Sequence, residues 1–279
     1  RDKGYGGYKD QWTNIEDDGK AFEIKTKEMF GLGWGNTIGS LRWNYLITPK
    51  LFSNTTLTYS KYLFDVKFES EEENVTQKIK TEEMFGYFSG IEDVSAKVDF
   101  DYFPFPGHEV KFGANYTNHL FSPGVLQLKF EDSDLDFDDI LDSLVNKEIR
   151  AHEYTAYVED DFVLTHSLRM NAGAQLSLFN VEGETYVRLQ PRVSLRYKAN
   201  DNWSIKASYS RMAQHVHLLA TSGINLPTDL WLPVTKKFEP PVSDQVALGL
   251  AFNLPKDLTF TIEGYYKNME NLIEYKEGA

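Results

Sequence analysis

Apolar and polar residues alternate along most of the chain, in segments of about ten residues. The clearest is segment 94–102, in which Val94 and Val98 fall on one face while Lys97 and Asp99 fall on the other. Successive side chains of a β-strand point to opposite faces of the sheet. The alternation therefore predicts strands that each have one apolar and one charged face.

Turns of two different lengths separate these segments. The short turns are expected at Pro49-Lys50, Pro104 to Gly107, Leu164 to Ser167, Asn200 to Asn202 and Pro255 to Asp257. The longer connections are expected near 70–80, 121–148, 180–187 and 212–242. A turn of about two to four residues joins antiparallel strands and is too short for a parallel crossover. We therefore predict an all-β fold, an antiparallel up-and-down meander of about 10–11 strands.

The alternation of short turns with long connections favours part of a transmembrane β-barrel. A tilted strand of about 9–11 residues crosses a bilayer, and outer-membrane barrels pair short periplasmic turns with long outer loops. Aromatic residues end several apolar faces beside the short turns, as expected for the girdles at bilayer interfaces. These aromatic residues are Tyr45, Tyr102, Tyr197, Trp203 and Phe252.

Composition excludes several classes of function. The 29 basic and 42 acidic residues give a net charge of −13, which argues against nucleic acid as a partner, because nucleic acids select basic surfaces. The absence of cysteine excludes disulfides and thiol chemistry. No apolar run is long enough for a transmembrane helix, and the mean hydropathy of −0.45 is compatible with strands that are apolar only at alternate positions. No serine-hydrolase, zinc-protease or phosphate-loop motif occurs, so we expect neither an enzyme nor a cofactor.

Six short segments resemble the barrel domain of TonB-dependent outer-membrane receptors, of the kind common in Bacteroidetes-type bacteria. They are 111–123 (KFGANYTNHLFSP), 154–161 (YTAYVEDD), 189–195 (LQPRVSL), 208–214 (SYSRMAQ), 237–245 (KFEPPVSDQ) and 263–269 (EGYYKNM). Their order and spacing carry the resemblance, since each segment alone is unspecific.

The resemblance implies a receptor that imports a scarce nutrient across the bacterial outer membrane, driven by the TonB complex. Siderophore-bound iron, cobalamin, glycans and peptides are the implied substrate classes. The implied partners are outer-membrane lipid, the receptor's own plug domain, the TonB complex acting through the N-terminal region, and a surface lipoprotein. Such receptors have barrels of about 22 strands. We therefore expect residues 1–279 to be a single barrel segment, without the plug domain and the last barrel strands.

Charged residues on the polar faces form the first candidate site, and in a barrel they would line a substrate path or face the plug. These residues are Arg42, Lys97, Asp99, Arg169, Arg192 and Arg196. Mutual pairing across adjacent strands is the alternative interpretation, and the favoured one for most of them.

Two further groups are candidate metal ligands. The acidic stretch 131–139 could bind a hard cation, which takes about six to eight oxygens, although a solvated loop is the alternative. Its candidate ligands are Asp132, Asp134, Asp136 and Asp138. His215 and His217 share one strand face, but two ligands are too few for a closed zinc site, so ordinary hydrogen bonds are favoured.

Two other functions remain open for such a sequence. One is a soluble all-β module that binds carbohydrate or another ligand, in which the apolar faces pack inside a sandwich. The other is an outer-membrane hydrolase, which requires a nucleophile and a base near the outer rim. The direction of the apolar faces distinguishes the soluble module from a barrel.

Overall fold

Strands make up most of the protein. The computed structural model describes residues 2–15, 21–75, 79–130, 148–219, 230–254 and 258–273. The strands are β1 (Asp2–Ile15), β2 (Ala21–Thr48), β3 (Leu51–Asn74), β4 (Ile79–Tyr102), β5 (His108–Phe130), β6 (Ile149–Thr165), β7 (Leu168–Val181), β8 (Glu184–Lys198), β9 (Trp203–Ala213), β10 (Val216–Leu219), β11 (Leu230–Pro233), β12 (Val242–Leu254) and β13 (Leu258–Glu270).

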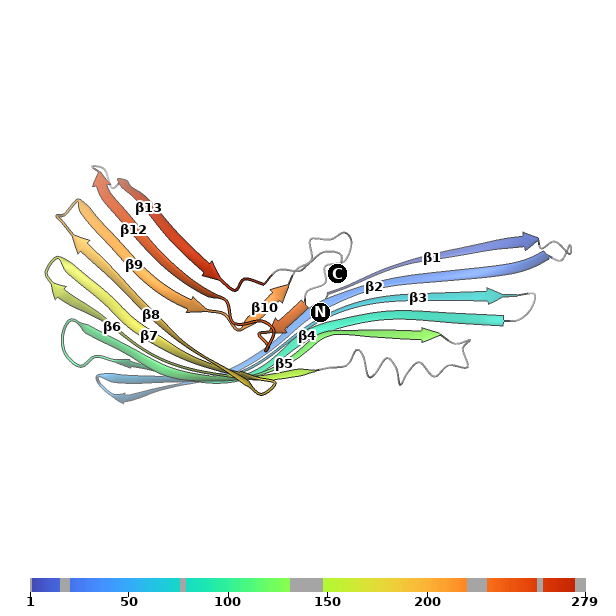
Figure 1. Ribbon diagram of the computed structural model, residues 1–279, viewed down its shortest axis with the longest axis horizontal. Helices are drawn as coiled ribbons and strands as arrows, with labels where there is room; N and C mark the ends of the chain where they lie inside the picture. The colour runs from blue at the N-terminus through green and yellow to red at the C-terminus, as the bar shows by residue number, and fades with distance from the viewer. Residues whose placement is uncertain are drawn as a thin grey trace.

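The strands follow one another in a single antiparallel meander. Among the described residues, eleven strands form one sheet in the order β1 to β9, β12 and β13. Strands β10 and β11 pair only with each other, and this hairpin lies within the curve of the long sheet (Figure 1). Across the described ranges, no helix is long and apolar enough to span a membrane. The predicted all-β meander is confirmed.

One face of the sheet is apolar and uncovered. The pairing register aligns Tyr116, Tyr154 and Leu178 on this face, and the preceding rows on the same face are also apolar. Leu41 and Leu248, at opposite sides of the sheet, are 69% and 62% exposed. Among the described residues no second sheet packs on these side chains, so the structure lacks the covered apolar face of a soluble sandwich.

The apolar face has a definite height. On β5 it extends from Val110, beside a short turn, to Tyr116, and the next residue on this face is Asn118. Asn118 aligns with His152 and Asn180 in a polar row. The seven residues from Val110 to Tyr116 span about 20 Å along the strand at about 3.4 Å per residue, and an outward apolar band beside short turns is typical of outer-membrane barrels. We call this region the apolar band, and the residues beyond the polar row lie outside it.

The strands extend further from the short turns than the sequence pattern indicated. The turns after Thr48, Tyr102, Thr165 and Lys198 lie where they were expected, whereas Pro255 to Asp257 lies outside the described residues. The connections predicted near 70–80 and 121–148 begin too early, because β3 continues to Asn74 and β5 to Phe130. Beyond a membrane both faces of a strand meet water, so the alternation disappears although the backbone pairing continues.

The prediction of a long connection near 180–187 is also wrong, because the connection there is a short turn. A two-residue turn, Glu182-Gly183, joins β7 directly to β8. Both residues have positive φ, 49° and 86°, as in the tight turns that match the twist of a β-hairpin. Glycine accommodates such a backbone readily, and Glu182 adopts it because the paired strands impose it.

The hydrophobic core lies between the polar face and the segment that joins β9 to β12. Phe121, Ala151, Phe179 and Val181 come from β5, β6 and β7, and Val234 comes from the residues after β11. All five are completely buried. The core therefore fixes the β10–β11 hairpin against the sheet, on the face opposite the apolar band.

Candidate functional site

The polar face of the sheet carries the candidate site. All six residues of the charged set identified in the sequence lie on this face, opposite the apolar band. Lys97 pairs with Asp99 at 3.0 Å, Arg169 with Asp161, and Arg192 with Glu159. Ion pairs within a strand or between neighbouring strands thus neutralise most of the set. Each pair is partly exposed to water, so it contributes about 1 kcal/mol or less to the stability of the fold.

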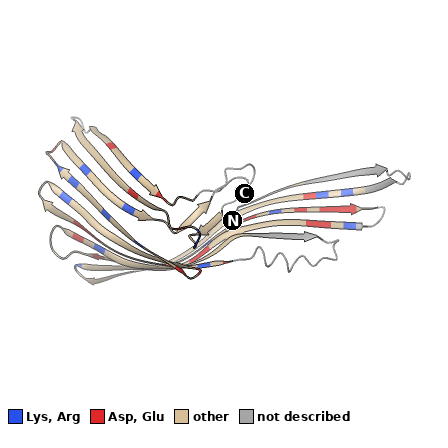
Figure 2. Cartoon of the chain, viewed as in Figure 1, with Lys and Arg blue, Asp and Glu red and all other residues tan. Residues whose placement is uncertain are grey.

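Cationic side chains lie side by side near one end of this face. The pairing register places Arg169 opposite Arg196, and Arg196 opposite Lys206. Basic positions on β8 and β9, close to the turn between these strands, are blue in Figure 2. Neither Arg196 nor Lys206 has an ion-pair partner among the described residues. Like charges directly opposite each other destabilise a sheet, so this row is a place where an anionic partner would stabilise the structure.

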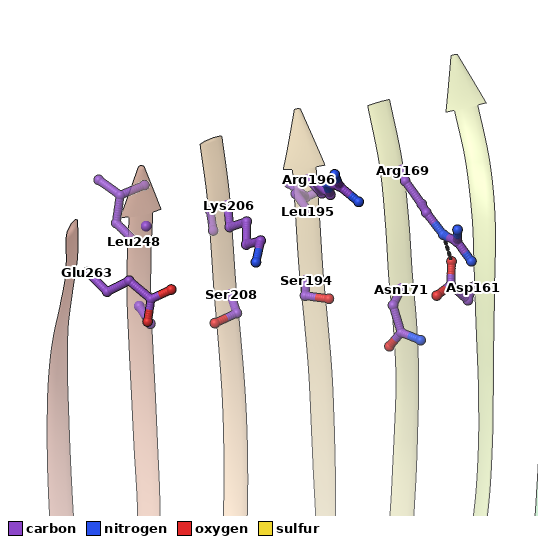
Figure 3. Close-up of a pocket in the computed structure, with 13 residues that line it drawn as sticks. Asp161, Arg169, Asn171, Ser194, Leu195, Arg196, Lys206, Ser208, Leu248 and Glu263 are labelled. Atoms are coloured by element: carbon purple, nitrogen blue, oxygen red, sulfur yellow. Dashed lines mark hydrogen bonds and ion pairs between the residues drawn. The ribbon is translucent and has the colours of Figure 1, made fainter. Parts of the chain in front are cut away.

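A groove of about 500 Å³ contains this cationic row. Figure 3 shows the basic side chains of Arg196 and Lys206 above Ser194 and Ser208, with Arg169 bonded to Asp161 on one side. The groove is lined by Asp161, Arg169, Asn171, Ser194, Leu195, Arg196, Lys206, Ala207, Ser208, Ala247, Leu248, Gly249 and Glu263. Its charges and hydroxyls suit recognition of a polar surface rather than of an apolar ligand.

Arg42 lies on β2, away from this groove. It is opposite Thr56, which in turn is opposite Lys97, so it belongs to the same face but to another part of it. The charged set is therefore not one site. Arg169 and Arg196 line the groove, Arg192 is bonded beside it, and Lys97 and Asp99 pair with each other on β4.

A second polar cluster lies beyond the apolar band, at the other end of the same face. Asp93 Oδ1 is 2.8 Å from His119 Nδ1, and His119 Nε2 is 3.4 Å from Glu153 Oε2. The other oxygen of Glu153 is 3.2 Å from Nδ1 of His215, which precedes β10. The ring of His215 stacks on Phe179, with centroids 4.9 Å apart. Sequence reasoning named His215 but not this cluster.

The charges of this cluster support one another. Burial alone would lower the pKa of His119, but the hydrogen bond to Asp93 and the nearby carboxylate of Glu153 outweigh it and raise the pKa to about 9. Burial would raise the pKa of Glu153, but His119 and His215 outweigh it and lower the pKa to about 2. The stabilisation from His119 is therefore complete below about pH 6.5 and is lost as the pH rises through about 9. That from Glu153 is present above about pH 4.5 and is lost as the pH falls through about 2.

The two predicted metal sites have different outcomes. Asp132, Asp134, Asp136 and Asp138 lie outside the described residues. His215 and His217 are both buried, but His215 binds Glu153, and no group of three metal-ligating side chains occurs in the part of the chain that the structure describes. Burial and the neighbouring His215 lower the pKa of His217, so its imidazole is neutral near neutral pH.

The sequence and the fold are both similar to known receptors. The family model described as TonB dependent receptor-like, beta-barrel, matches residues 1–279. A search of curated protein sequences gives no match.

Solved structures of similar fold cover nearly the whole chain. The siderophore receptor PirA from Acinetobacter baumannii has a TM-score of 0.50 and 11% identity, over 98% of this chain and 50% of its own. The FrpB iron transporter from Neisseria meningitidis has a TM-score of 0.49 and 12% identity, over 96% and 46%. The alcaligin outer-membrane receptor FauA from Bordetella pertussis has a TM-score of 0.45 and 17% identity, over 100% and 51%. The chain thus spans about half the length of these structures.

Proposed function

Because the chain belongs to the TonB-dependent receptor β-barrel family, we propose that it forms part of the wall of a receptor that imports a scarce nutrient. The family's barrels lie in the bacterial outer membrane and act as receptors and transporters rather than enzymes. In this proposal residues 1–279 are a single barrel segment that encloses part of a plug domain, and TonB supplies the energy for transport.

The contrast between the two faces of the sheet is the observation that supports this function best. Leu41 and Leu248 lie on an uncovered apolar band, which suits outer-membrane lipid as the partner. Lys97, Asp99 and Arg192 lie on the opposite face, which would line the lumen. We refer to this polar face as the lumenal face.

The cationic row at the end of the lumenal face supports contact with the plug. The short turn between β8 and β9 marks the periplasmic end of the barrel in this orientation, since outer-membrane barrels have their short turns there. Arg196 and Lys206 lie a few residues from that turn and face the lumen without ion-pair partners among the described residues. An acidic surface of the plug would neutralise them. Arg42, Lys97, Asp99 and Arg192 would line the remaining wall.

Nutrient uptake by the full-length receptor tests the proposed function. We expect a strain lacking the receptor to lose growth on at least one of three sources supplied as the limiting nutrient, and the intact receptor to restore it. The sources are ferric siderophores, cobalamin and defined glycans or peptides. Siderophores come first because the siderophore receptor PirA from Acinetobacter baumannii has a similar fold. Restoration should disappear when TonB is deleted. Equal growth of both strains on every source would contradict uptake.

Charge reversal in the cationic row tests the plug contact. Arg196→Glu with Lys206→Glu is expected to loosen the plug, because breaking a desolvated charge pair costs about 2 kcal/mol or more. The measurement is the entry of a large antibiotic through the outer membrane, which should increase. The control is Arg150→Glu with Lys67→Glu, which reverses one arginine and one lysine at exposed positions beyond the apolar band. Equal antibiotic entry in both double variants would contradict this role of the row.

A further inference from the structure

A carboxylate interrupts the apolar band beside the short turns. Asp160 on β6 lies between Val110 on β5 and Ala172 on β7, in the first row of the band. On the apolar face of β4 to β8, between the short turns and the polar row, Asp160 and His108 are the only residues with a charged or imidazole side chain. The short turns lie at the same end of the sheet (Figure 1), so both residues lie where the band meets the periplasmic surface of the membrane.

The two side chains are bonded to each other and held by aromatic rings. His108 Nδ1 is 2.7 Å from Asp160 Oδ2. The ring of His108 stacks on Phe162 with centroids 5.3 Å apart, and it meets the ring of Phe105 in an edge-to-face arrangement at 4.5 Å. Because its partner is packed between two rings, the carboxylate of Asp160 has a fixed position on a surface that is otherwise apolar.

The carboxylate of Asp160 has unused capacity for hydrogen bonds. An ionised carboxylate accepts about four hydrogen bonds. Among the described residues only His108 binds it, and Oδ1 has no partner. Arg169 on the next strand binds Asp161 on the lumenal face instead, so it does not neutralise this charge. The side chain of Asp160 is 29% exposed, and rotation about its soft terminal bond brings either oxygen to the exposed side.

We propose that Asp160 and His108 form a binding site for a phospholipid whose headgroup ends in a primary ammonium, in the leaflet on the periplasmic side. The ammonium donates charge-assisted hydrogen bonds to Asp160. The ring of Phe105, which is 57% exposed, offers the same ammonium an aromatic face. The acyl chains of the lipid lie along the apolar band. The inference rests on the proposed contact of this band with lipid, but not on nutrient uptake.

The charges at the site favour an ammonium headgroup over an anionic one. A carboxylate at the membrane boundary repels an anionic headgroup and attracts a cation, and an ionisable group on a lipid-facing surface calls for such a partner. The phosphate of the same lipid has a cation available on this membrane surface. Lys50 is exposed and donates a hydrogen bond to the backbone oxygen of Pro104 at 2.6 Å, directly before Phe105. A zwitterionic headgroup thus matches both signs of charge.

Lipid retention by the full-length receptor tests the site. The purified receptor is mixed with equal amounts of phosphatidylethanolamine and phosphatidylglycerol that have identical acyl chains, and native mass spectrometry counts the lipids that remain bound. The wild-type receptor is expected to retain about fivefold more phosphatidylethanolamine, because only this lipid supplies an ammonium to the carboxylate. Asp160→Asn keeps the shape of the side chain but removes its charge, and it should abolish the preference.

Two further measurements make the result specific. Asp101→Asn removes a carboxylate near the same turn but on the lumenal face, where it lies 3.7 Å from Lys111, and the lipid preference should remain as in the wild type. Phosphatidylcholine has the same headgroup charge but no N–H donor, so the wild-type receptor should retain less of it than of phosphatidylethanolamine. This comparison needs no variant, so it holds even if Asp160→Asn impairs folding, which heat-modifiable migration on gels reveals.

The outcomes separate this site from the proposed function. Equal retention of phosphatidylethanolamine and the other two lipids by the wild-type receptor would overturn the site, and so would an unchanged preference in folded Asp160→Asn. A receptor that shows the preference but restores no growth would overturn only nutrient uptake, since lipid retention requires no transported ligand.

Discussion

Leu176→Arg is expected to lower the free energy of unfolding of the membrane-inserted receptor by about 2–4 kcal/mol. Leu176 lies in the apolar band, 48% exposed, in line with Ala114 and Ala156 of the neighbouring strands. A guanidinium there would lie near the centre of the lipid, where neither water nor a carboxylate can solvate it. The adjacent Gln175→Arg points to the lumen and should change the stability by no more than about 0.5 kcal/mol.

Equilibrium unfolding by denaturant in lipid vesicles measures both variants. The pair is matched, because both introduce arginine at consecutive positions of β7 and differ only in the face on which it lies. The difference between them therefore reports the orientation of the sheet. Equal destabilisation by the two arginines, or a larger effect of Gln175→Arg, would contradict the assignment of the apolar band to lipid.

The orientation of the sheet could be predicted from the sequence because one physical constraint acts on every strand within the membrane. Lipid on one side and a polar lumen on the other impose strict alternation. The alternation in segment 94–102 predicted the two faces of this end of β4 correctly. The ion pair of Lys97 was not predicted, because its partner Asp99 lies on the same strand and not on an adjacent one. The short turns after Thr48, Tyr102 and Lys198 were also evident, since proline, glycine or asparagine marks them. The two-residue turn Glu182-Gly183 was missed, because its segment was predicted as a long connection.

The outer parts of the strands could not be predicted in the same way. In the acidic end of β3, Glu71 pairs with Lys27 on β2 at 3.6 Å and with Lys80 on β4 at 3.1 Å. These cross-strand pairs and the backbone ladder hold a strand that has no apolar face. Such a sequence has the composition of a loop, and only the neighbouring strands make it extended.

The polar cluster formed by Asp93, His119, Glu153 and His215 was partly encoded in the sequence. Asp93 and His119 lie at nearly equal distances from the turn at Pro104 to Gly107, so a regular hairpin must place them opposite each other, as the structure does. The contact of Glu153 with His215 has no comparable signal. It depends on the return of a long connection onto the sheet, and a separation of 62 residues along the chain leaves such a contact undetermined by local pattern.

Gly113→Ala is expected to destabilise the barrel by about 1–3 kcal/mol, although alanine ordinarily suits a strand better than glycine. A Cβ atom at position 113 would lie 2.5 Å from the backbone oxygen of Val98 and 2.9 Å from the ring of Tyr157. The ring can move, but the backbone oxygen belongs to β4 and can move only with its strand. Gly39→Ala is the control, since nothing lies within 4 Å of its Cβ, and it should be neutral or slightly stabilising.

A hydrogen bond beside Gly113 allows the cause of the destabilisation by Gly113→Ala to be measured. Tyr157 donates to Asp99 at 2.7 Å across the glycine, and Tyr157→Phe alone should cost about 1 kcal/mol because the carboxylate loses a donor. If alanine at position 113 displaces the ring, the bond is already broken, and Tyr157→Phe should then cost much less in the Gly113→Ala background. Unfolding of the four combinations in lipid vesicles gives this coupling energy. Full additivity would mean that the ring stays in place and that the clash with β4 accounts for the whole destabilisation.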